Sequence, residues 1–158
     1  MTHRAPPGFA LIELLISVAI VALLAGGAMS FADLALQRSD EQQLRIALRE
    51  IREAIDAYKV AADAKRIARA ADETGYPRSL AELTDGITDA TSAKGEKLYF
   101  LRRLPRDPMA DPALPAEATW GLRAYASDPA HPEPGRDVFD VHSRSVRRGL
   151  NGQPYTAW

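Results

Sequence analysis

A single carboxylate, Glu13, lies inside an apolar run near the N-terminus of this chain of 158 residues. No charged residue stands between Glu13 and Asp33. An ion left alone in hydrocarbon costs several kcal/mol, so an intramembrane carboxylate normally has a partner of opposite charge. The chemistry that Glu13 offers is therefore charge pairing with a group outside its own apolar run.

A second set of polar residues, near the C-terminus, has the atom types of a metal site. Its members are His131, Asp137, Asp140 and His142. Their spacing matches no known pattern of transition-metal ligands, and an exposed His beside an Asp is common by chance. The sequence therefore predicts no metal site here.

The sequence carries no signal of catalysis. Ser143 and Ser145 follow these residues, but a hydrolase needs a nucleophile on a sharp turn, a base within reach and an oxyanion hole. No glycine-rich phosphate loop occurs. Arg102, Arg103 and Arg106 form a small basic patch, either a surface for a partner or a solvated loop that arginine hydrogen bonds anchor, and the second interpretation is favoured.

Length and composition limit the architecture. The chain is long enough for one membrane helix and one domain of about 125 residues. A formal net charge of −1 leaves no basic excess to hold a phosphate backbone, so nucleic acid is not an expected partner. The chain has no cysteine, which excludes disulfides, thiol catalysis and Cys-type zinc sites.

The element that positions Glu13 is predicted to span a membrane. As a helix, the uncharged stretch after Glu13 reaches about 30 Å, the thickness of a hydrocarbon core. The turn-forming sequence 6–8 precedes the apolar run, whereas the cleavage site of a secretory signal follows its run. His3 and Arg4, with no acid beside them, predict a cytoplasmic N-terminus.

A long amphipathic helix is predicted from about residue 33 to about residue 72. Its apolar stripe recurs at steps of three and four and consists of Leu44, Leu48, Ile51, Ile55, Tyr58 and Ala62. Opposite charges four residues apart, such as Glu41 with Arg45 and Arg52 with Asp56, indicate a solvated outer face. The sequence 39–42 also fits a capping box, which leaves open a helix break near residue 40. The stripe could be a coiled-coil seam, but the core of a domain is favoured.

The later elements are short. Gly75 and Pro77 are predicted to end the long helix, and 79–86 is predicted to be a short helix opened by a capping box. A polar surface loop follows to about residue 97, and the proline-rich segment 98–115 should be irregular but anchored. Strands are predicted at 119–127 and 138–143, with a third short strand or tail at 154–158.

The residues Gly8-Phe9-Ala10-Leu11-Ile12-Glu13-Leu14-Leu15 closely resemble the prepilin processing motif of type IV pilins and type II secretion pseudopilins. In that family a membrane peptidase cuts after the glycine and methylates the new N-terminus. The resemblance implies cleavage between Gly8 and Phe9, N-methylation of Phe9, and assembly through Glu13. Glu13 of one subunit would pair with the Phe9 amine of a neighbour.

The rest of the chain resembles the major pseudopilin of type II secretion. The matching segments follow in the family's order: 75–77, 79–83, 99–108, 120–121 and 137–141. Type IV pilins share the N-terminal motif but commonly carry a C-terminal cysteine pair, which this chain lacks. Major pseudopilins often bind calcium in a C-terminal loop, but here that loop, 143–152, has three arginines and no acid. Because calcium needs several carboxylate ligands, we do not expect calcium or any other cofactor.

The resemblance implies an α+β, pilin-like fold: a long N-terminal helix with a small antiparallel sheet packed on its second half. It divides the chain into a cytoplasmic leader (1–8), a transmembrane and assembly helix (9–32) and a periplasmic domain (33–158). The implied function is non-enzymatic: a filament subunit of the bacterial inner membrane and periplasm that drives protein export. Its implied partners are copies of itself, the prepilin peptidase, other pseudopilins, the inner-membrane assembly platform and membrane lipid.

Two alternatives stay open at this point. The first is a minor pseudopilin or a type IV pilin subunit. The second belongs to a different class, a signal-anchored periplasmic enzyme or binding module that keeps its leader and does not depend on Glu13.

Overall fold

A computed structural model describes the backbone of residues 7–158 and the side chains of residues 11–23 and 31–158. Most of the predicted leader and the side chain of Phe9 lie outside the described residues, and only the backbone of Gly8 is described. The chain divides into two compact units, Met1–Ser39 and Asp40–Trp158, which are described separately.

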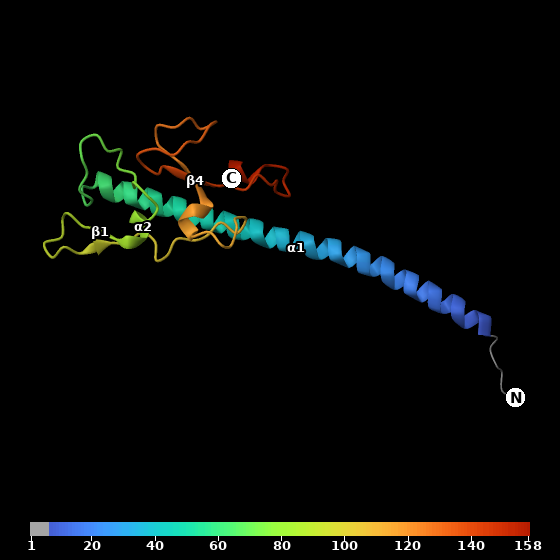
Figure 1. Cartoon of the computed structure of the whole chain (residues 1–158). Coiled ribbons are helices and arrows are strands. Elements are labelled where there is room, and N and C mark those ends of the chain that lie inside the picture. Colours follow the sequence, from blue (N-terminus) through green and yellow to red (C-terminus); the bar gives the residue numbers. More distant parts are fainter. Residues whose placement is uncertain (1–6) are drawn as a thin grey trace. The chain divides into compact units, whose positions relative to one another are not determined.

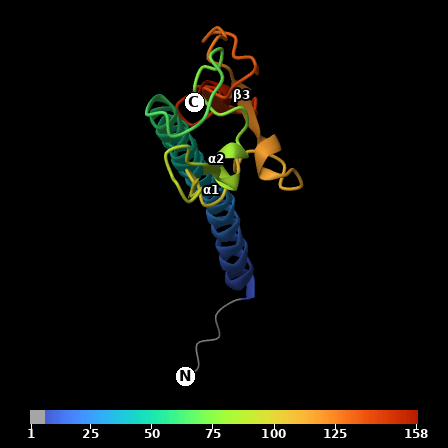
Figure 2. The same cartoon turned by 90° about the vertical axis from the view of Figure 1, so that its left-hand side faces the viewer.

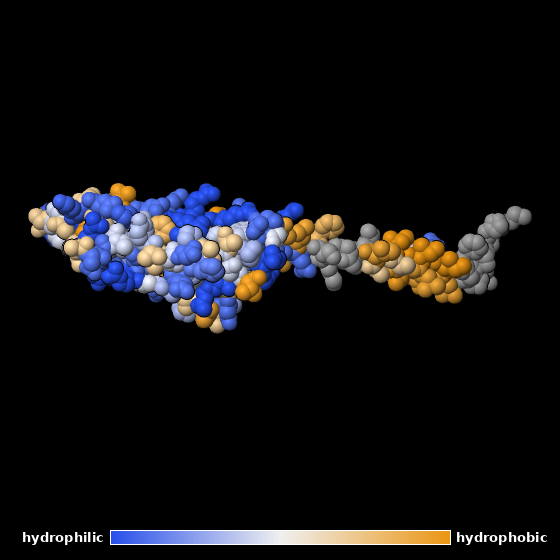
Figure 3. Space-filling view, turned by 90° about the horizontal axis from the view of Figure 1, so that it is seen from above, coloured by the Kyte–Doolittle hydropathy of each residue, from blue (hydrophilic) through white to orange (hydrophobic). Residues whose placement is uncertain are grey.

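The described residues of the first unit are helical. They belong to α1, which runs from Pro7 to Asp63 (Figure 1). The helix is continuous through residue 40, so the alternative of a break there is not found. The described side chains from Leu11 to Leu23 are all exposed, and Figure 3 shows that this segment is covered almost entirely by apolar residues. Among the described residues, no helix is long and apolar enough to cross a membrane.

The C-terminal end of α1 lies in the second unit, nine residues before the predicted end near residue 72. Lys65 adopts a left-handed conformation, with φ of 59°. The Arg66 N–H donates to the Ala61 carbonyl (2.9 Å) and the Lys65 N–H donates to the Ala62 carbonyl (3.0 Å). These two bonds form a Schellman motif, which ends a helix by satisfying its last carbonyls. The prediction was wrong because the sequence has no glycine at this position to signal the cap.

Replacing Lys65 with glycine is expected to stabilise the second unit by about 0.5–1 kcal/mol, because the left-handed conformation costs a residue with a Cβ atom about 1–2 kcal/mol and glycine little. The gain is smaller than that strain because glycine loses more backbone entropy on folding. Urea unfolding of the full chain in detergent measures the change. The control, Lys65→Ala, keeps the strain and should leave the midpoint unchanged; a glycine variant that unfolds earlier than wild type would refute this account.

The second unit adds short elements to the end of α1. They are helix α2 (Glu82–Asp85), strands β1 (Ile87–Thr88), β2 (Lys97–Leu98), β3 (Trp120–Arg123) and β4 (Asp140–Ser143), and the 3-10 helices η1 (Ala116–Thr119) and η2 (Tyr155–Ala157). β1 pairs with β2 and β3 pairs with β4, both antiparallel. The α+β fold class with small antiparallel sheets is therefore confirmed. Of the strand or tail predicted at 154–158, the strand does not form: Pro154 makes an isolated bridge with Arg148, and residues 155–157 form η2.

The core forms along the predicted stripe of α1. All six stripe residues are buried, from Leu44 to Ala62. The later elements contribute Leu80, Leu83, Leu101, Trp120, Val138, Val141 and Tyr155 to the same cluster. In Figure 2 the end of α1 is surrounded by α2, β3 and the connecting loops. The stripe is therefore a domain core, as predicted.

The predicted capping box at 79–82 does not form. The N-cap residue of α2 is Ala81, and it makes no side-chain cap. The Glu82 carboxylate instead accepts hydrogen bonds from the Arg78 N–H (3.0 Å) and from the Tyr58 hydroxyl (3.0 Å) of α1. Burial, and then the bond to Glu82, raise the pKa of Tyr58 above its usual value. Glu82 thus fixes α2 to α1.

The proline-rich segment is anchored, as predicted. The Trp120 indole N–H donates to the Pro105 carbonyl (2.9 Å). The Arg106 guanidinium donates to the carbonyls of Leu114 (2.5 Å) and Asp111 (2.8 Å). These bonds hold both ends of an irregular loop without regular secondary structure.

Asp107 connects this loop to the sheet. Its side chain is almost completely buried, with 1 % of the residue exposed. The carboxylate accepts bonds from the Ser143 hydroxyl (2.6 Å) and the Met109 N–H (2.8 Å). The Asp107 N–H donates to the Thr119 hydroxyl (3.2 Å). One buried acid therefore joins the loop, η1 and β4.

Candidate functional site

Glu13 is exposed on the first unit's helix, and the residues next to it in sequence, Ile12 and Leu14, are apolar and exposed. Leu14 and Leu15 beside it are 61 % and 69 % exposed. Among the described residues, Glu13 forms no hydrogen bond or ion pair. The described residues 11–23 therefore present one carboxylate on a surface that is otherwise mostly apolar.

Phe9 lies four residues before Glu13 in the same helix. Residues four apart share a face of an α-helix, so the Phe9 backbone nitrogen and Glu13 lie about one turn apart. The helix thus keeps the proposed new N-terminus and the carboxylate at a fixed axial spacing. Such a spacing allows the amine of one copy to meet the carboxylate of another when parallel helices are shifted along their axis.

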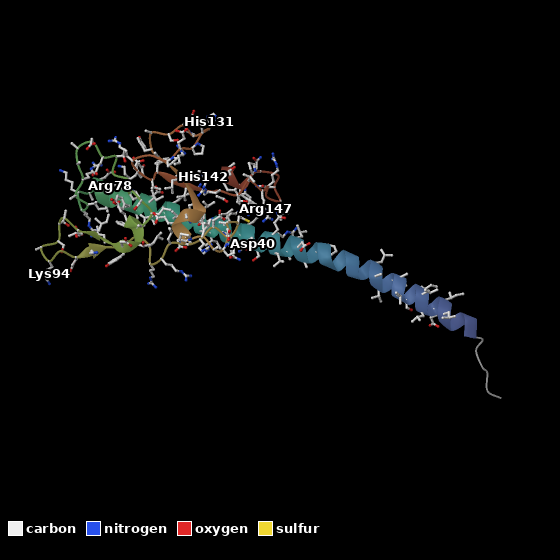
Figure 4. All side chains as sticks on the ribbon, viewed as in Figure 1. Asp40, Arg78, Lys94, His131, His142 and Arg147 are labelled. Atoms are coloured by element: carbon white, nitrogen blue, oxygen red, sulfur yellow. The ribbon has the colours of Figure 1, made fainter. Side chains whose placement is uncertain are left out.

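The histidines and aspartates of the candidate metal set are not brought together. Figure 4 shows His131 on an outer loop and His142 on the sheet. The His131 ring pairs only with Asp128, at 3.9 Å, and both side chains are largely exposed. Among the described residues, no group of three metal-ligating side chains is close enough to hold an ion.

Both aspartates of this set make hydrogen bonds within the domain. Asp137 accepts bonds from the Thr74 hydroxyl (2.5 Å) and the Tyr125 N–H (2.8 Å). Asp140 accepts a bond from the Arg52 guanidinium (2.7 Å), which reaches it from α1. These contacts tie the sheet to the rest of the second unit and leave neither carboxylate pointing into a cation site.

His142 packs on the backbone of the neighbouring strand. It stands opposite Gly121 in the β3–β4 register, and a Cβ atom at Gly121 would lie 2.2 Å from the His142 Nε2. Burial lowers the pKa of His142, and the charge of Asp140 opposes that shift. The glycine therefore makes room for a half-buried, predominantly neutral ring in the sheet.

Ser143 is also part of the fold. Its hydroxyl donates to the Asp107 carboxylate and accepts a bond from the Ser145 N–H (3.1 Å). The side chain is completely buried, so a substrate has no access to it.

A buried acid of α1, Glu41, holds the loop 143–152, which corresponds to the calcium-binding loop of major pseudopilins. The burial of Glu41 was not predicted from the sequence. The Glu41 carboxylate of α1 accepts bonds from the Leu150 N–H (2.7 Å) and the Tyr155 hydroxyl (3.0 Å). Glu41 is 4 % exposed and lies 3.8 Å from Arg45. The spacing of four residues to Arg45 predicted a solvated ion pair. Helix periodicity alone cannot show that Leu150 and Tyr155, far away in the sequence, cover this face of the helix.

Two arginines of α1, Arg45 and Arg52, bind the C-terminal residue Trp158. The Arg52 guanidinium bonds to Asp140 and to the carbonyls of Val141 (3.0 Å) and Trp158 (2.9 Å). The Arg45 guanidinium lies 4.5 Å from the centre of the Trp158 ring. The predicted pairing of Arg52 with Asp56 is replaced by these long-range contacts, which no local spacing could reveal.

A cleft of about 730 Å³ lies beside the end of α1 and the segment that follows it. Its charged side chains pair with one another: Arg78 with Glu73, and Arg136 with Asp72 (3.2 Å). Arg66, just after α1, forms another such pair with Asp89, just after β1. A hydrogen bond from the Thr91 hydroxyl and the Arg66 guanidinium lower the pKa of Asp89 to about 2.

Comparison with known proteins agrees with the N-terminal site. Residues 7–29 match the family described as the Prokaryotic N-terminal methylation motif. The matched range includes Gly8, Phe9 and Glu13, and the match supports a relationship to the type IV pilin-like proteins. No curated protein and no solved structure matches the chain.

Proposed function

We propose that this chain, which carries a prepilin-type methylation motif and has a pilin-like α+β fold, is the major structural subunit of a type II secretion pseudopilus. The observation that carries the proposal is the position of Glu13, four residues after Phe9, inside the matched motif. A methylation motif marks the N-terminus as a substrate of processing. The carboxylate gives the processed end a partner in the next copy.

In this proposal the prepilin peptidase cuts between Gly8 and Phe9 and methylates the Phe9 amine. The precursor has an amide at Phe9 and therefore no cation for Glu13 to pair with. Cleavage creates the cation, and burial of either charge alone in lipid is expensive. Assembly is thereby restricted to processed subunits.

The proposal places residues 9–32 in the bacterial inner membrane and residues 33–158 in the periplasm. Support for this placement comes from the charge-free stretch between Glu13 and Asp33 and from the basic, acid-free leader. The exposed apolar surface of residues 11–23 needs either lipid or other helices to cover it. In this proposal, lipid covers the apolar surface before assembly, and the packed helices of the filament cover it afterwards.

The first alternative, a minor pseudopilin or a type IV pilin subunit, shares every N-terminal feature. The absence of cysteine favours a pseudopilin over a type IV pilin. Copy number in purified filaments separates the major subunit from a minor one. The second alternative, a signal-anchored enzyme or binding module, gains no support from the cleft beside the end of α1, where Arg78 pairs with Glu73 and Arg136 with Asp72.

Mass spectrometry of the mature protein tests processing. Protein from cells with an active prepilin peptidase is expected to begin at Phe9 and to carry one added methyl group. Cells without the peptidase provide the control, in which residues 1–8 should remain attached. An N-terminus that keeps residues 1–8 in the presence of the active peptidase would exclude the filament proposal and favour the signal-anchored alternative.

A further inference from the structure

The loop 143–152, called the arginine loop below, is positively charged. Two of its arginines form no ion pair with an acid among the described residues. The loop contains Arg144, Arg147 and Arg148 and no acidic residue. All three side chains are exposed, and Figure 4 shows Arg147 at the surface. Neither Arg144 nor Arg147 forms an ion pair with a carboxylate among the described residues. The Arg144 guanidinium donates to the Ala118 carbonyl (3.2 Å), a contact that leaves its charge in place.

Exposed apolar side chains alternate with these charges. Val146 is 87 % exposed, more than any other large apolar residue described, and Leu150 is 45 % exposed. Guanidinium groups next to apolar tips are typical of segments that lie in the interface between water and lipid. Exposure of the Val146 side chain to water alone is unfavourable, whereas contact with lipid would cover it.

The arginine loop is fixed to the part of the second unit where the chain enters it. The Leu150 N–H donates to Glu41, and the second unit begins at Asp40. Ten positions separate Glu41 from Phe31, at the end of the uncharged stretch. Ten residues cover about 15 Å as a helix and at most about 35 Å when extended. Connectivity alone therefore keeps the loop near any bilayer that contains the uncharged stretch.

We infer that the arginine loop binds the anionic headgroups of the membrane in which the N-terminal segment is inserted. This inference rests on the membrane placement of the proposed function and adds a lipid contact made by the second unit. A guanidinium matches the geometry of a phosphate with two parallel hydrogen bonds, and a basic side chain near an anionic surface strengthens binding about fivefold. The contact would hold the second unit against the bilayer before assembly.

A fluorophore on the loop tests the contact. The chain has no cysteine, so Gln153→Cys, next to the loop, gives a single labelling site. The full processed chain is inserted into vesicles of phosphatidylcholine, with or without phosphatidylglycerol, that contain a headgroup quencher. We expect strong quenching only in the anionic vesicles, and its loss in about 1 M salt, where charges are screened within about 3 Å.

Two double variants with equal charge separate a local contact from net charge. Arg144→Gln/Arg147→Gln should weaken docking about fivefold for each arginine. Arg102→Gln/Arg103→Gln removes the same charge from two exposed arginines outside the loop and should leave the quenching unchanged. A label at Lys94→Cys, in the loop between β1 and β2, should not be quenched.

Equal quenching in neutral and anionic vesicles would overturn the inference, because tethering alone would then explain it. Quenching that requires a high protein density, together with crosslinks from Gln153→Cys to another copy, would assign the loop to a neighbouring subunit and also overturn it. Flotation of the vesicles after an alkaline wash reports insertion in the same sample. A chain that is washed off contradicts the proposed function and this inference with it, whereas an inserted chain with an unquenched loop contradicts this inference alone.

Discussion

The Glu13→Val variant is expected to insert into the membrane at the wild-type level and to form no filaments. Valine removes the only acidic group between the leader and Asp33, so the change does not hinder insertion. Assembly then has no partner for the Phe9 amine, and an unpaired charge buried among packed helices costs about 3–5 kcal/mol per subunit. This penalty applies to every subunit, so the loss should be complete.

Sheared filaments and membrane fractions from the same cells provide the two measurements. Glu13→Gln keeps the size of the side chain but not its charge, and it should fail as valine does. Ser17→Val, one helical turn further along, makes a similar polar-to-apolar change without removing charge and should assemble normally. Wild-type filament levels from Glu13→Val would contradict the charge-pairing account, even if processing at Gly8 were normal.

The second large effect is expected in the second unit, from Asp107→Ala. This change leaves the Ser143 hydroxyl and the Met109 N–H without their acceptor in a buried place. Each hydrogen bond to a charged group contributes about 1.5–3 kcal/mol, and the lost carboxylate also leaves a small cavity. We expect a loss of about 3 kcal/mol, a large fraction of the stability of an ordinary domain.

Urea unfolding of the full chain in detergent, followed by tryptophan fluorescence, measures this loss. Trp120 reports directly, because its indole bonds to Pro105 at the start of the same loop. The matched control is Asp111→Ala, an exposed aspartate that caps only the Ala113 N–H (2.8 Å) and should cost about 1 kcal/mol or less. If the two variants lost equal stability, the buried network would not be the cause.

Local patterns predicted the buried stripe of α1 and the positions of β3 and β4, but not the end of α1 at Asp63 or the pairing of β1 with β2. The stripe from Leu44 to Ala62 repeats with the helical period, and every one of its positions is buried. The alternation at 119–127 and 138–143 predicted β3 and β4, although both strands are shorter than expected. The motif around Glu13 could be read because its chemistry depends on residues that are close in sequence.

The residues missed were polar and buried, and their partners lie far away in the sequence. Glu41 bonds to Leu150 and Tyr155, which are 109 and 114 positions away. Asp107 was part of a recognised segment, but nothing near it predicted that its carboxylate would accept a bond from β4. Spacing reports which face of an element a residue occupies, whereas the burial of a charge depends on what the whole fold places over it.

The long-range hydrogen bonds from Arg52 and Glu41 of α1 to the C-terminal segment also determine when the second unit can fold. In the proposed placement the stripe of α1 leaves the ribosome and crosses the membrane early, but Arg52 cannot bind Trp158, 106 positions later, and Glu41 cannot bind Tyr155 until those residues have followed. Contacts of such high sequence separation form late and slow folding. If the chain is exported as proposed, the apolar side of the helix stays uncovered until the last residues arrive, and subunits arrested before residue 155 would be open to proteolysis and to premature association.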